Sequence, residues 1–170
     1  SRKVLDDSAK RGQWDFAPVI PIHRIEGKTV GIVGVGRIGS TVHAKMRGMG
    51  CKFLGCDPYL PPERIKELGI PIVDRDTLFR ESDYVTVHTP LNDETRHIVS
   101  ARALSLMKPT AYLVNTSRGG MVDHDALYAA LKEKRIAGAA IDVFDKEPPD
   151  PDFPLMGLDN CVVTPHLAWY

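Results

Sequence analysis

Short apolar runs alternate with segments of helical pattern along almost the whole of this chain. The runs lack the polar alternation of a strand with one face in water, so each is typical of a strand buried on both faces of a parallel sheet. Six strands are expected, at Thr29–Val33, Lys52–Cys56, Tyr84–His88, Ala111–Asn115, Ala139–Val143 and Cys161–Thr164. A short piece at Ile70–Val73 is a candidate for a further edge strand.

Segments of helical pattern fill the intervals between these strands. They are expected at Ile38–Met49, Pro62–Leu68, Asp76–Glu81, Ala101–Met107 and Asp123–Lys134. In the last of them Asp123 is the expected N-cap and Gly138 the expected stop signal. Short strand–helix–strand connections favour right-handed crossovers. The predicted fold class is therefore α/β, a Rossmann-type doubly wound, mostly parallel sheet with helices on both faces.

The chain before residue 27 fits this pattern poorly. Lys3–Arg11 has the pattern of a helix, and Trp14–Pro21 carries two prolines, as an extended arm would. The segment Lys146–Pro154 holds four prolines and is expected to be a loop. Because 170 residues suit one domain, we expect a core at 27–170 preceded by a helix and an arm at 1–26.

Composition argues against several classes of function. Basic and acidic residues number 22 each, so no charge imbalance favours nucleic acid or a membrane surface as a partner. The three cysteines form no CxxC pair, which argues against a zinc site and a disulfide framework. No apolar run approaches the roughly 20 residues of a membrane span, and the polar N-terminus does not resemble a signal peptide. We therefore expect a cytoplasmic protein without a metal.

A glycine-rich turn joins the first expected strand to the first expected helix. Its three glycines, Gly34, Gly36 and Gly39, have the spacing GxGxxG between a strand and a helix. The first permits a tight turn, the second lets the backbone approach a pyrophosphate, and the third allows close helix–strand packing. Backbone N–H groups at the helix start would meet the phosphate charge. The turn therefore predicts a dinucleotide site.

Asp57 stands 18 positions after Gly39, at the end of the second expected strand. A carboxylate there would accept hydrogen bonds from both adenosine ribose hydroxyls of NAD and repel the 2′-phosphate of NADP. The alternative is an aspartate that only forms a turn before Pro58. Together with the glycine turn, Asp57 favours NAD as the cofactor.

Six motifs between Gly27 and the end of the chain resemble the D-isomer-specific 2-hydroxy-acid dehydrogenases, the family of phosphoglycerate, glycerate and D-lactate dehydrogenases. They are GKTVGIVGVGRIG at 27–39, CDPY at 56–59, VHTPL at 87–91, LVNTSRGGMVD at 113–123, AAIDVFDKEP at 139–148 and TPHLAWY at 164–170. The resemblance implies NAD-dependent hydride transfer between nicotinamide and a D-2-hydroxy acid or its 2-keto acid, such as phosphoglycerate or glycerate/hydroxypyruvate.

The resemblance assigns three catalytic residues. Arg118 would bind the substrate carboxylate and carbonyl, for which a planar guanidinium is better suited than a lysine. His166 would exchange the proton of the substrate hydroxyl, which imidazole can do in both directions near neutral pH. Glu147 would hydrogen-bond this imidazole, hold its tautomer and stabilise its charged form.

The same resemblance assigns the cofactor contacts. Asp142 would orient the nicotinamide amide. The remaining positions are Gly34, Gly36, Arg37, Ile38, Gly39, Asp57, His88, Thr89, Pro90, Thr95, Thr116, Ser117, Arg118, His166 and Trp169. The other histidines, His23, His43, His97 and His124, are interpreted as surface or capping residues without a chemical role.

Complete family members have a second domain, which closes over the substrate, and neither half of it is recognisable in this sequence. We therefore expect an isolated NAD-binding domain that binds the cofactor with little or no turnover, since catalysis needs a closed cleft. The resemblance also assigns the arm before Gly27 to the pairing of two such domains, with Trp14 and Phe16 as anchors of a homodimer. Alternatively, these aromatic residues cover the edge of their own domain.

Other functions remain alternatives. The stretches CDPYLPP and TPHLAWY also resemble the C-terminal-binding proteins, corepressors whose pairing depends on NAD, so the chain could be an NAD-gated protein-interaction module. Formate dehydrogenases are relatives with glutamine at the position of Glu147, so the glutamate favours proton-coupled hydride transfer. A nucleotide-binding domain without chemistry would leave Arg118, Glu147 and His166 unexplained.

Overall fold

The six strands form one fully parallel sheet in the order β2-β1-β3-β4-β5-β6. The structure is a computed structural model that describes residues 2–14, 17 and 23–168. The strands are β1 Thr29–Val33, β2 Lys52–Cys56, β3 Tyr84–Val87, β4 Tyr112–Asn115, β5 Gly138–Ile141 and β6 Cys161–Val163. All six expected strands are present, with ends that differ by at most two residues from the predicted ones, and the predicted α/β class is confirmed.

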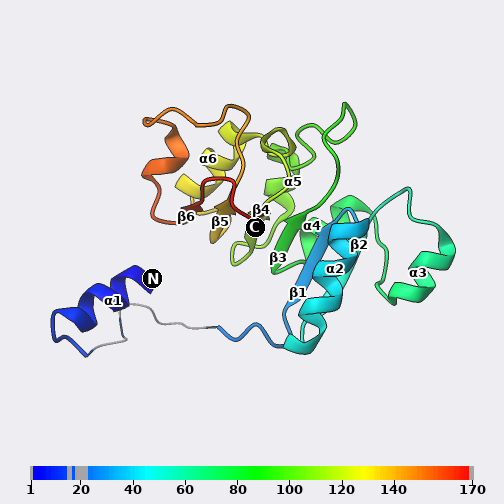
Figure 1. The fold of residues 1–170 in the computed structure, drawn as a ribbon, viewed down its shortest axis with the longest axis horizontal. Coiled ribbons are helices and arrows are strands. Elements are labelled where there is room, and N and C mark those ends of the chain that lie inside the picture. The colour runs from blue at the N-terminus through cyan, green and yellow to red at the C-terminus, as the bar shows by residue number, and fades with distance from the viewer. Residues whose placement is uncertain (1, 15–16, 18–22, 169–170) are drawn as a thin grey trace.

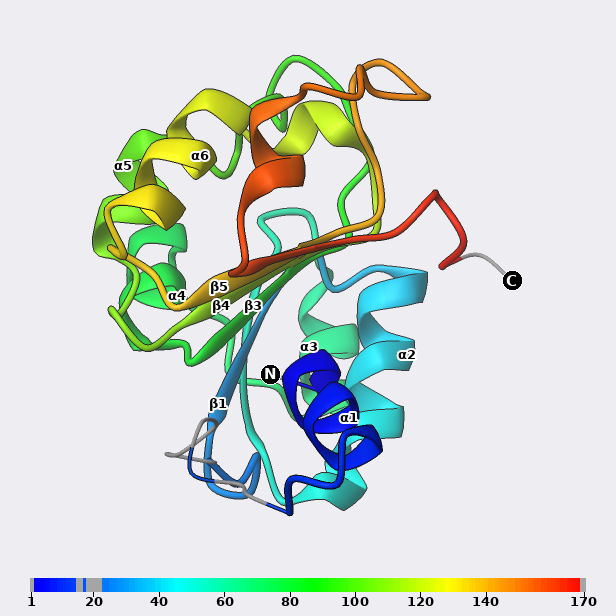
Figure 2. The same ribbon diagram turned by 90° about the vertical axis from the view of Figure 1, so that its left-hand side faces the viewer.

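Helices cover both faces of this sheet. They are α1 Arg2–Lys10, α2 Arg37–Met46, α3 Pro62–Leu68, α4 Arg75–Glu81, α5 Ala101–Leu106 and α6 His124–Lys132, with 3-10 turns η2 Arg47–Met49, η3 Gly119–Met121 and η4 Pro154–Gly157. In Figure 2, α4, α5 and α6 lie on one side of the sheet and α2 and α3 on the other. Helix α1 stands apart from the sheet and its helices in Figure 1. The doubly wound arrangement therefore involves α2 to α6.

Side-chain caps explain where three of these helices begin. The carboxylate of Asp74 accepts a hydrogen bond from the N–H of Thr77 at the start of α4, and Ser100 caps α5 in the same way. Asp123 accepts from the N–H of Ala126 at 3.0 Å, so its predicted role as the N-cap of α6 is confirmed. Each cap satisfies an N–H that the helix leaves without a partner.

The prediction that Gly138 ends α6 is wrong. The helix ends at Lys132, and Lys134 turns the chain with a φ of 55° in the left-handed region. Gly138 instead opens β5, where a Cβ atom would come within 2.9 Å of the carbonyl oxygen of Asn160. Close approach of the neighbouring backbone therefore explains this glycine.

The piece at Ile70–Val73 pairs with the edge strand β2 through one parallel bridge, between Gly55 and Ile72. The N–H of Gly55 donates to the carbonyl of Pro71, and the N–H of Val73 donates to the carbonyl of Gly55. The predicted edge strand is thus present as a single bridge. It lies beyond β2, on one side of β1, whereas β3 and the later strands lie on the other side of β1. The crevice above β1 and β3 is therefore the switch point at which ligands bind in such sheets.

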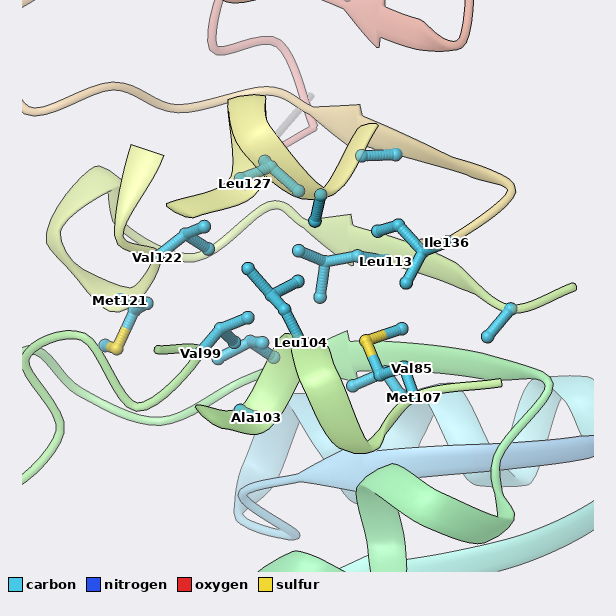
Figure 3. Packing of buried hydrophobic residues seen from close by; sticks show 14 of the residues in the cluster. Val85, Val99, Ala103, Leu104, Met107, Leu113, Met121, Val122, Leu127 and Ile136 are labelled. Atoms are coloured by element: carbon cyan, nitrogen blue, oxygen red, sulfur yellow. The ribbon is translucent and has the colours of Figure 1, made fainter. Parts of the chain in front are cut away.

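Two apolar clusters fill the spaces between the sheet and its helices. The larger cluster packs α5 and α6 against β3 and β4, and Figure 3 shows Leu104, Leu113 and Leu127 at its centre. The smaller cluster contains Val30, Ile32, Val35 and Ile70. Burial on both faces explains why the strands lack polar alternation. Because both faces are packed, the sheet is rigid, and polar side chains can be placed at the carboxyl ends of its strands.

Candidate active site and cofactor cavity

Two of the cavities at the carboxyl ends of the strands are lined by residues that the sequence singled out. The larger one, about 550 Å³, is lined by the glycine turn and by the loops after β2 and β3, and we call it the glycine-turn cavity. The smaller one, about 380 Å³, is lined by residues of the loops after β5 and β6, including Asp142, Glu147 and His166, and we call it the His166 cavity.

The glycine turn is built as its spacing predicts. Gly34 has a φ of 87°, and a Cβ atom there would lie 2.7 Å from the side chain of Thr89. At Gly39 a Cβ atom would lie 2.1 Å from the carbonyl oxygen of Gly34, so the helix can approach the strand only because this residue is glycine. At Gly36 a Cβ atom would meet no atom within 4 Å. The open space at Gly36 is the room that a pyrophosphate needs.

Asp57 lines the glycine-turn cavity at the end of β2. Its Oδ2 accepts a hydrogen bond from the N–H of Val35 at 2.9 Å, and its Oδ1 accepts one from the N–H of Tyr59 at 3.1 Å. The bond from Tyr59 is the one expected if Asp57 only forms a turn before Pro58. The bond from Val35 holds the carboxylate against the glycine turn. Both interpretations of Asp57 are thus compatible with the geometry, and the carboxylate borders the space that would hold a ribose.

The loop after β3 forms the facing wall of this cavity. His88, Thr89, Pro90 and Thr95 line it as expected. The hydroxyl of Thr95 donates to the carbonyl of Pro90 at 2.6 Å, which closes the loop on itself. The ring of His88 contacts the hydroxyl of Thr86 at 2.9 Å, and burial lowers the pKa of this histidine. His88 is therefore a neutral wall residue at neutral pH.

Tyr59 and Glu94 border the same cavity and were missed by sequence reasoning. The hydroxyl of Tyr59 donates to Oε2 of Glu94 at 2.5 Å, joining the loop after β2 to the loop after β3. Tyr59 belongs to the CDPY motif, so a signal existed for it. Glu94 lies 35 positions further along the chain and had none.

Arg37 and Ile38 occupy the first turn of α2, and both are exposed. Thr116 and Ser117 follow β4, where the hydroxyl of Ser117 donates to the carbonyl of Thr89 at 2.9 Å. This bond ties the loop after β4 to the wall of the glycine-turn cavity. Trp169 and Phe16, both singled out from the sequence, lie outside the residues that the structure describes.

Glu147 and His166 form a hydrogen-bonded pair although they are 19 positions apart. Oε2 of Glu147 lies 2.6 Å from Nδ1 of His166, and Oε1 accepts a hydrogen bond from the backbone N–H of Phe144 at 2.9 Å. Hydrogen bonding to His166, and next to the Phe144 N–H, lowers the pKa of Glu147 below its ordinary value. The carboxylate is therefore charged at neutral pH and orients the ring through Nδ1, leaving Nε2 for a substrate.

Asp142 holds the backbone of the segment that carries His166. Its carboxylate accepts hydrogen bonds from the N–H groups of Leu167 and Ala168, both at 3.0 Å, and from the hydroxyl of Thr164. The backbone carbonyl of Asp142 also accepts from the N–H of His166, whose φ of 50° is in the left-handed region. Burial raises the pKa of Asp142, but these hydrogen bonds outweigh it, so the pKa is lowered. The resemblance did not predict this scaffolding by Asp142.

Arg118 follows β4 at the same edge of the sheet but is not in contact with the pair. Its Nη1 donates to the carbonyl of Ser117 at 2.7 Å, and its own backbone carbonyl accepts from Nδ2 of Asn115. Within the described part of the chain, Arg118 makes no ion pair and is absent from the walls of both cavities. The structure thus assembles two of the three expected catalytic side chains and leaves the guanidinium exposed.

Two of the remaining histidines contradict their interpretation as surface residues. His43 in α2 is 6% exposed and packs its ring edge-on against Phe53. His124 in α6 has an 11% exposed side chain and packs against Phe144 and Phe153. Neither position carries a sequence signal for burial, because histidine is common at both surfaces and interfaces.

Within residues 2–14, 17 and 23–168, no helix is long and apolar enough to cross a membrane. The same residues contain no group of three or more histidine, cysteine or acidic side chains placed to hold a metal ion.

Comparison with known proteins gives one consistent family. The profile described as D-isomer specific 2-hydroxyacid dehydrogenase, NAD binding domain, matches residues 2–168. The chain is 45% identical over 160 residues to a D-3-phosphoglycerate dehydrogenase of Methanocaldococcus jannaschii, covering 94% of this chain and 30% of that protein. It is 46% identical over 173 residues to a glyoxylate reductase of Korarchaeum cryptofilum, covering 99% of this chain and 52% of that protein.

The fold is similar to that of solved enzymes of the same kind. A D-lactate dehydrogenase from Aquifex aeolicus, solved with NAD and lactic acid, superposes with a TM-score of 0.87 at 34% identity, covering 99% of this chain and 55% of that one. The chain thus spans 30% to 55% of the length of the relatives described above.

Proposed function

This chain belongs to the D-isomer-specific 2-hydroxyacid dehydrogenase family as its NAD-binding domain, and on that premise we propose that the whole protein transfers a hydride between NAD and a D-2-hydroxy acid or 2-keto acid. The observation that carries the proposal is the contact of 2.6 Å between Glu147 and His166. A carboxylate that orients an imidazole is the arrangement required to move a proton to or from the substrate hydroxyl.

The cofactor fits the residues present. The glycine turn leaves space at Gly36 where a side chain would intrude, and the carboxylate of Asp57 borders the same cavity. Gly34, Gly36 and the start of α2 would hold the pyrophosphate, and Asp57 the adenosine ribose. When bound, NAD supplies the hydride acceptor and donor. The domain's own residues orient it and handle the proton.

His166 exchanges the proton in either direction. In oxidation of the hydroxy acid, Nε2 of His166 takes the hydroxyl proton while the carbon loses its hydride. In reduction of the keto acid, the same nitrogen returns a proton to the new alkoxide. Glu147 stabilises the imidazolium that exists between these events, because its charge lies 2.6 Å from Nδ1.

Arg118 is proposed as the substrate anchor. Its guanidinium is exposed at the carboxyl edge of the sheet, and toward the residues that the structure describes it donates one hydrogen bond, from Nη1 to the carbonyl of Ser117, so most of its donors are open to a substrate. A bidentate bond to the substrate carboxylate would draw it toward His166. Arg118→Lys in the whole protein should raise KM and lower kcat, because an ammonium cannot reproduce the planar grip.

The substrate class is taken from the relatives. They are dehydrogenases and reductases of phosphoglycerate, glyoxylate and hydroxypyruvate by name, so the proposed substrate is a small 2-hydroxy or 2-keto acid. These relatives give no support to the alternative of a corepressor-like interaction module. A cytoplasmic location remains a prediction from the sequence.

The decisive experiment is an assay of the full-length protein with NADH against a panel of 2-keto acids, including glyoxylate, hydroxypyruvate and 3-phosphohydroxypyruvate. We expect turnover with at least one of them and a loss of at least about a hundredfold in kcat for His166→Gln. A full-length protein that binds NADH but reduces none of the panel would overturn the proposal.

We also propose that residues 27–170 form the cofactor core and that residues 1–26 pair two copies of the domain. Trp14 is 93% exposed, and α1 stands apart from the core in Figure 1, so both are available to a second copy. Sedimentation equilibrium should show a dimer that Trp14→Ala weakens. A chain that stays monomeric at high concentration would exclude this role.

A further inference from the structure

His124 occupies an unusual place for a histidine. It lies in the first turn of α6, and its ring sits 5.7 Å from the ring of Phe144 and 5.6 Å from that of Phe153, between centroids. The two phenylalanine rings are themselves 5.6 Å apart, so the three rings form one cluster, which we call the aromatic trio. Its Nε2 is buried and has no hydrogen-bond partner in the part of the chain that the structure describes.

Packing alone does not account for this imidazole. A buried polar nitrogen without a partner is unfavourable, and a third phenylalanine would fill the same place without that loss. Histidine differs from phenylalanine here chiefly in its ability to take up a proton near neutral pH. The unsatisfied nitrogen therefore suggests that protonation of His124 changes the position of its ring or of its neighbours.

The aromatic trio is connected to the catalytic pair by one residue. Phe144 contributes its ring to the trio and its backbone N–H to Oε1 of Glu147, at 2.9 Å. The other oxygen of Glu147 holds Nδ1 of His166. Behind Phe144 the backbone is tightly confined, since a Cβ atom on Gly119 would lie 2.1 Å from the carbonyl carbon of Phe144. Because the N–H of Phe144 is bonded to Glu147, a displacement of Phe144 would disturb that hydrogen bond.

Charged groups surround the open side of His124. Oδ2 of Asp145 lies 4.0 Å from Nδ1. Asp123, the N-cap of α6, and Asp125 are neighbours of His124 in the chain, and His97 from the loop before α5 lines a cavity together with it. Lys146 and Asp150 line the same cavity, of about 300 Å³.

These surroundings favour different positions for the neutral and the charged ring. Burial lowers the pKa of His124, and the pull of Asp145 in the opposite direction is smaller, so the ring is neutral at neutral pH. A protonated ring would leave apolar surroundings that do not solvate it and approach the carboxylate of Asp145. That movement would take His124 out of the aromatic trio.

We propose that His124 is a positioning residue for the Glu147–His166 pair, which it orders while neutral through Phe144 and loosens when it is protonated and drawn to Asp145. The proposal rests on the proposed function, in which this pair exchanges the substrate proton. It adds a residue that touches neither substrate nor cofactor and whose protonation changes the order of the catalytic pair.

The test follows the His166 ring by NMR in the 170-residue chain with 13C-labelled histidine, from about pH 4 to pH 9. In the wild type we expect a step in the chemical shift of His166 that coincides with the titration of His124. His124→Phe keeps a ring in the trio but cannot be protonated, so this step should be lost. His124→Ala removes the ring, so the chemical shift of His166 at neutral pH should move toward its value in Glu147→Gln.

His43→Phe is the matched control, because His43 is also buried against a phenylalanine but lies in α2, on the opposite face of the sheet. It should leave both the step and the neutral-pH chemical shift of His166 unchanged. A step that survives His124→Phe, or a neutral-pH chemical shift that His124→Ala leaves unchanged, would overturn the proposal. The titration needs neither substrate nor cofactor. An inactive full-length protein would therefore contradict the proposed function but would not change the result expected from this test.

Discussion

At the scale of single residues, two glycines of the same turn serve different purposes. Gly36 leaves room for the cofactor, and Gly39 allows the helix to pack against the strand. Gly36→Ala adds a methyl group that meets no atom within 4 Å, so the fold should tolerate it. The methyl would enter the space proposed for the pyrophosphate, and NADH affinity should fall at least about tenfold, or 1.4 kcal/mol. Calorimetric titration with NADH measures this loss, and urea unfolding should show an unchanged midpoint.

Gly39→Ala is the contrasting variant. Its methyl group would lie 2.1 Å from the carbonyl oxygen of Gly34, and a backbone atom cannot be displaced cheaply. We expect a loss of about 1–3 kcal/mol in unfolding free energy. Equal effects of the two alanines on stability would contradict the packing described for this turn.

Glu147→Gln tests the electrostatics of the pair. The pKa of Glu147 is lowered in the folded chain, first by its bond to His166, from an ordinary value of 4.5. Such a carboxyl stabilises the fold above that value, and this contribution is lost as the pH falls through the lower folded value. The wild type should therefore be more stable than Glu147→Gln at about pH 6, with the difference shrinking toward about pH 3. Thermal unfolding across this range measures it, and a difference that grows in acid would contradict the pairing.

The pairing of Glu147 with His166 shows where sequence reasoning depends on resemblance. Nothing in a spacing of 19 residues across a proline-rich loop brings two side chains together. The two residues were paired because their motifs resemble a family in which both positions are catalytic. The contribution of Phe144 to this site is a backbone N–H, which leaves no trace in the identity of the side chain.

At the scale of elements, the strands and helix starts were predictable and the helix ends less so. Burial on both faces selects continuous apolar runs, and Asp123 signals the start of α6 through a side-chain hydrogen bond. The end of α6 has no comparable signal. Lys134 makes the left-handed turn that glycine usually makes, and Gly138 is required for strand contact instead.

Lys134→Gly should therefore stabilise the domain. A non-glycine residue with φ near 55° carries a penalty of about 1–2 kcal/mol, while glycine adds about 0.5–1 kcal/mol of unfolded-chain entropy. The expected net gain is about 0.5–1 kcal/mol in unfolding free energy, measured by urea denaturation. Lys134→Ala keeps the penalty and is the control, so an equal gain from alanine would assign the effect to the lost charge.

At the scale of the whole molecule, the topology followed from the order of the elements. Right-handed crossovers on alternate faces leave few ways to arrange six parallel strands, and the glycine turn identifies β1, the strand beside the switch point. What could not be predicted is how the loops after β4, β5 and β6 meet. Their geometry depends on the carboxylate of Asp142 and on the aromatic trio, which are long-range contacts without a local pattern.

The whole domain should respond to cofactor even where it does not turn over. A ligand that binds only the folded chain raises the unfolding free energy by about 2.7 kcal/mol at a concentration one hundred times Kd. For a chain of this length, that corresponds to a rise of roughly 5–10 °C in Tm. We expect this shift for the 170-residue chain with NADH, together with little or no oxidation of NADH by 2-keto acids, because the opposite wall of the substrate cleft would be missing.

Differential scanning calorimetry gives the shift and NADH absorbance gives the turnover. Gly36→Ala is the control, since a tenfold loss of affinity should reduce the shift to about half at the same NADH concentration, while the Tm of the free chain is kept. A Tm that does not respond to NADH in the wild type would contradict the cofactor cavity. Rapid turnover by the 170 residues alone would show that Glu147, His166 and Arg118 suffice to bind and reduce the substrate without a second domain.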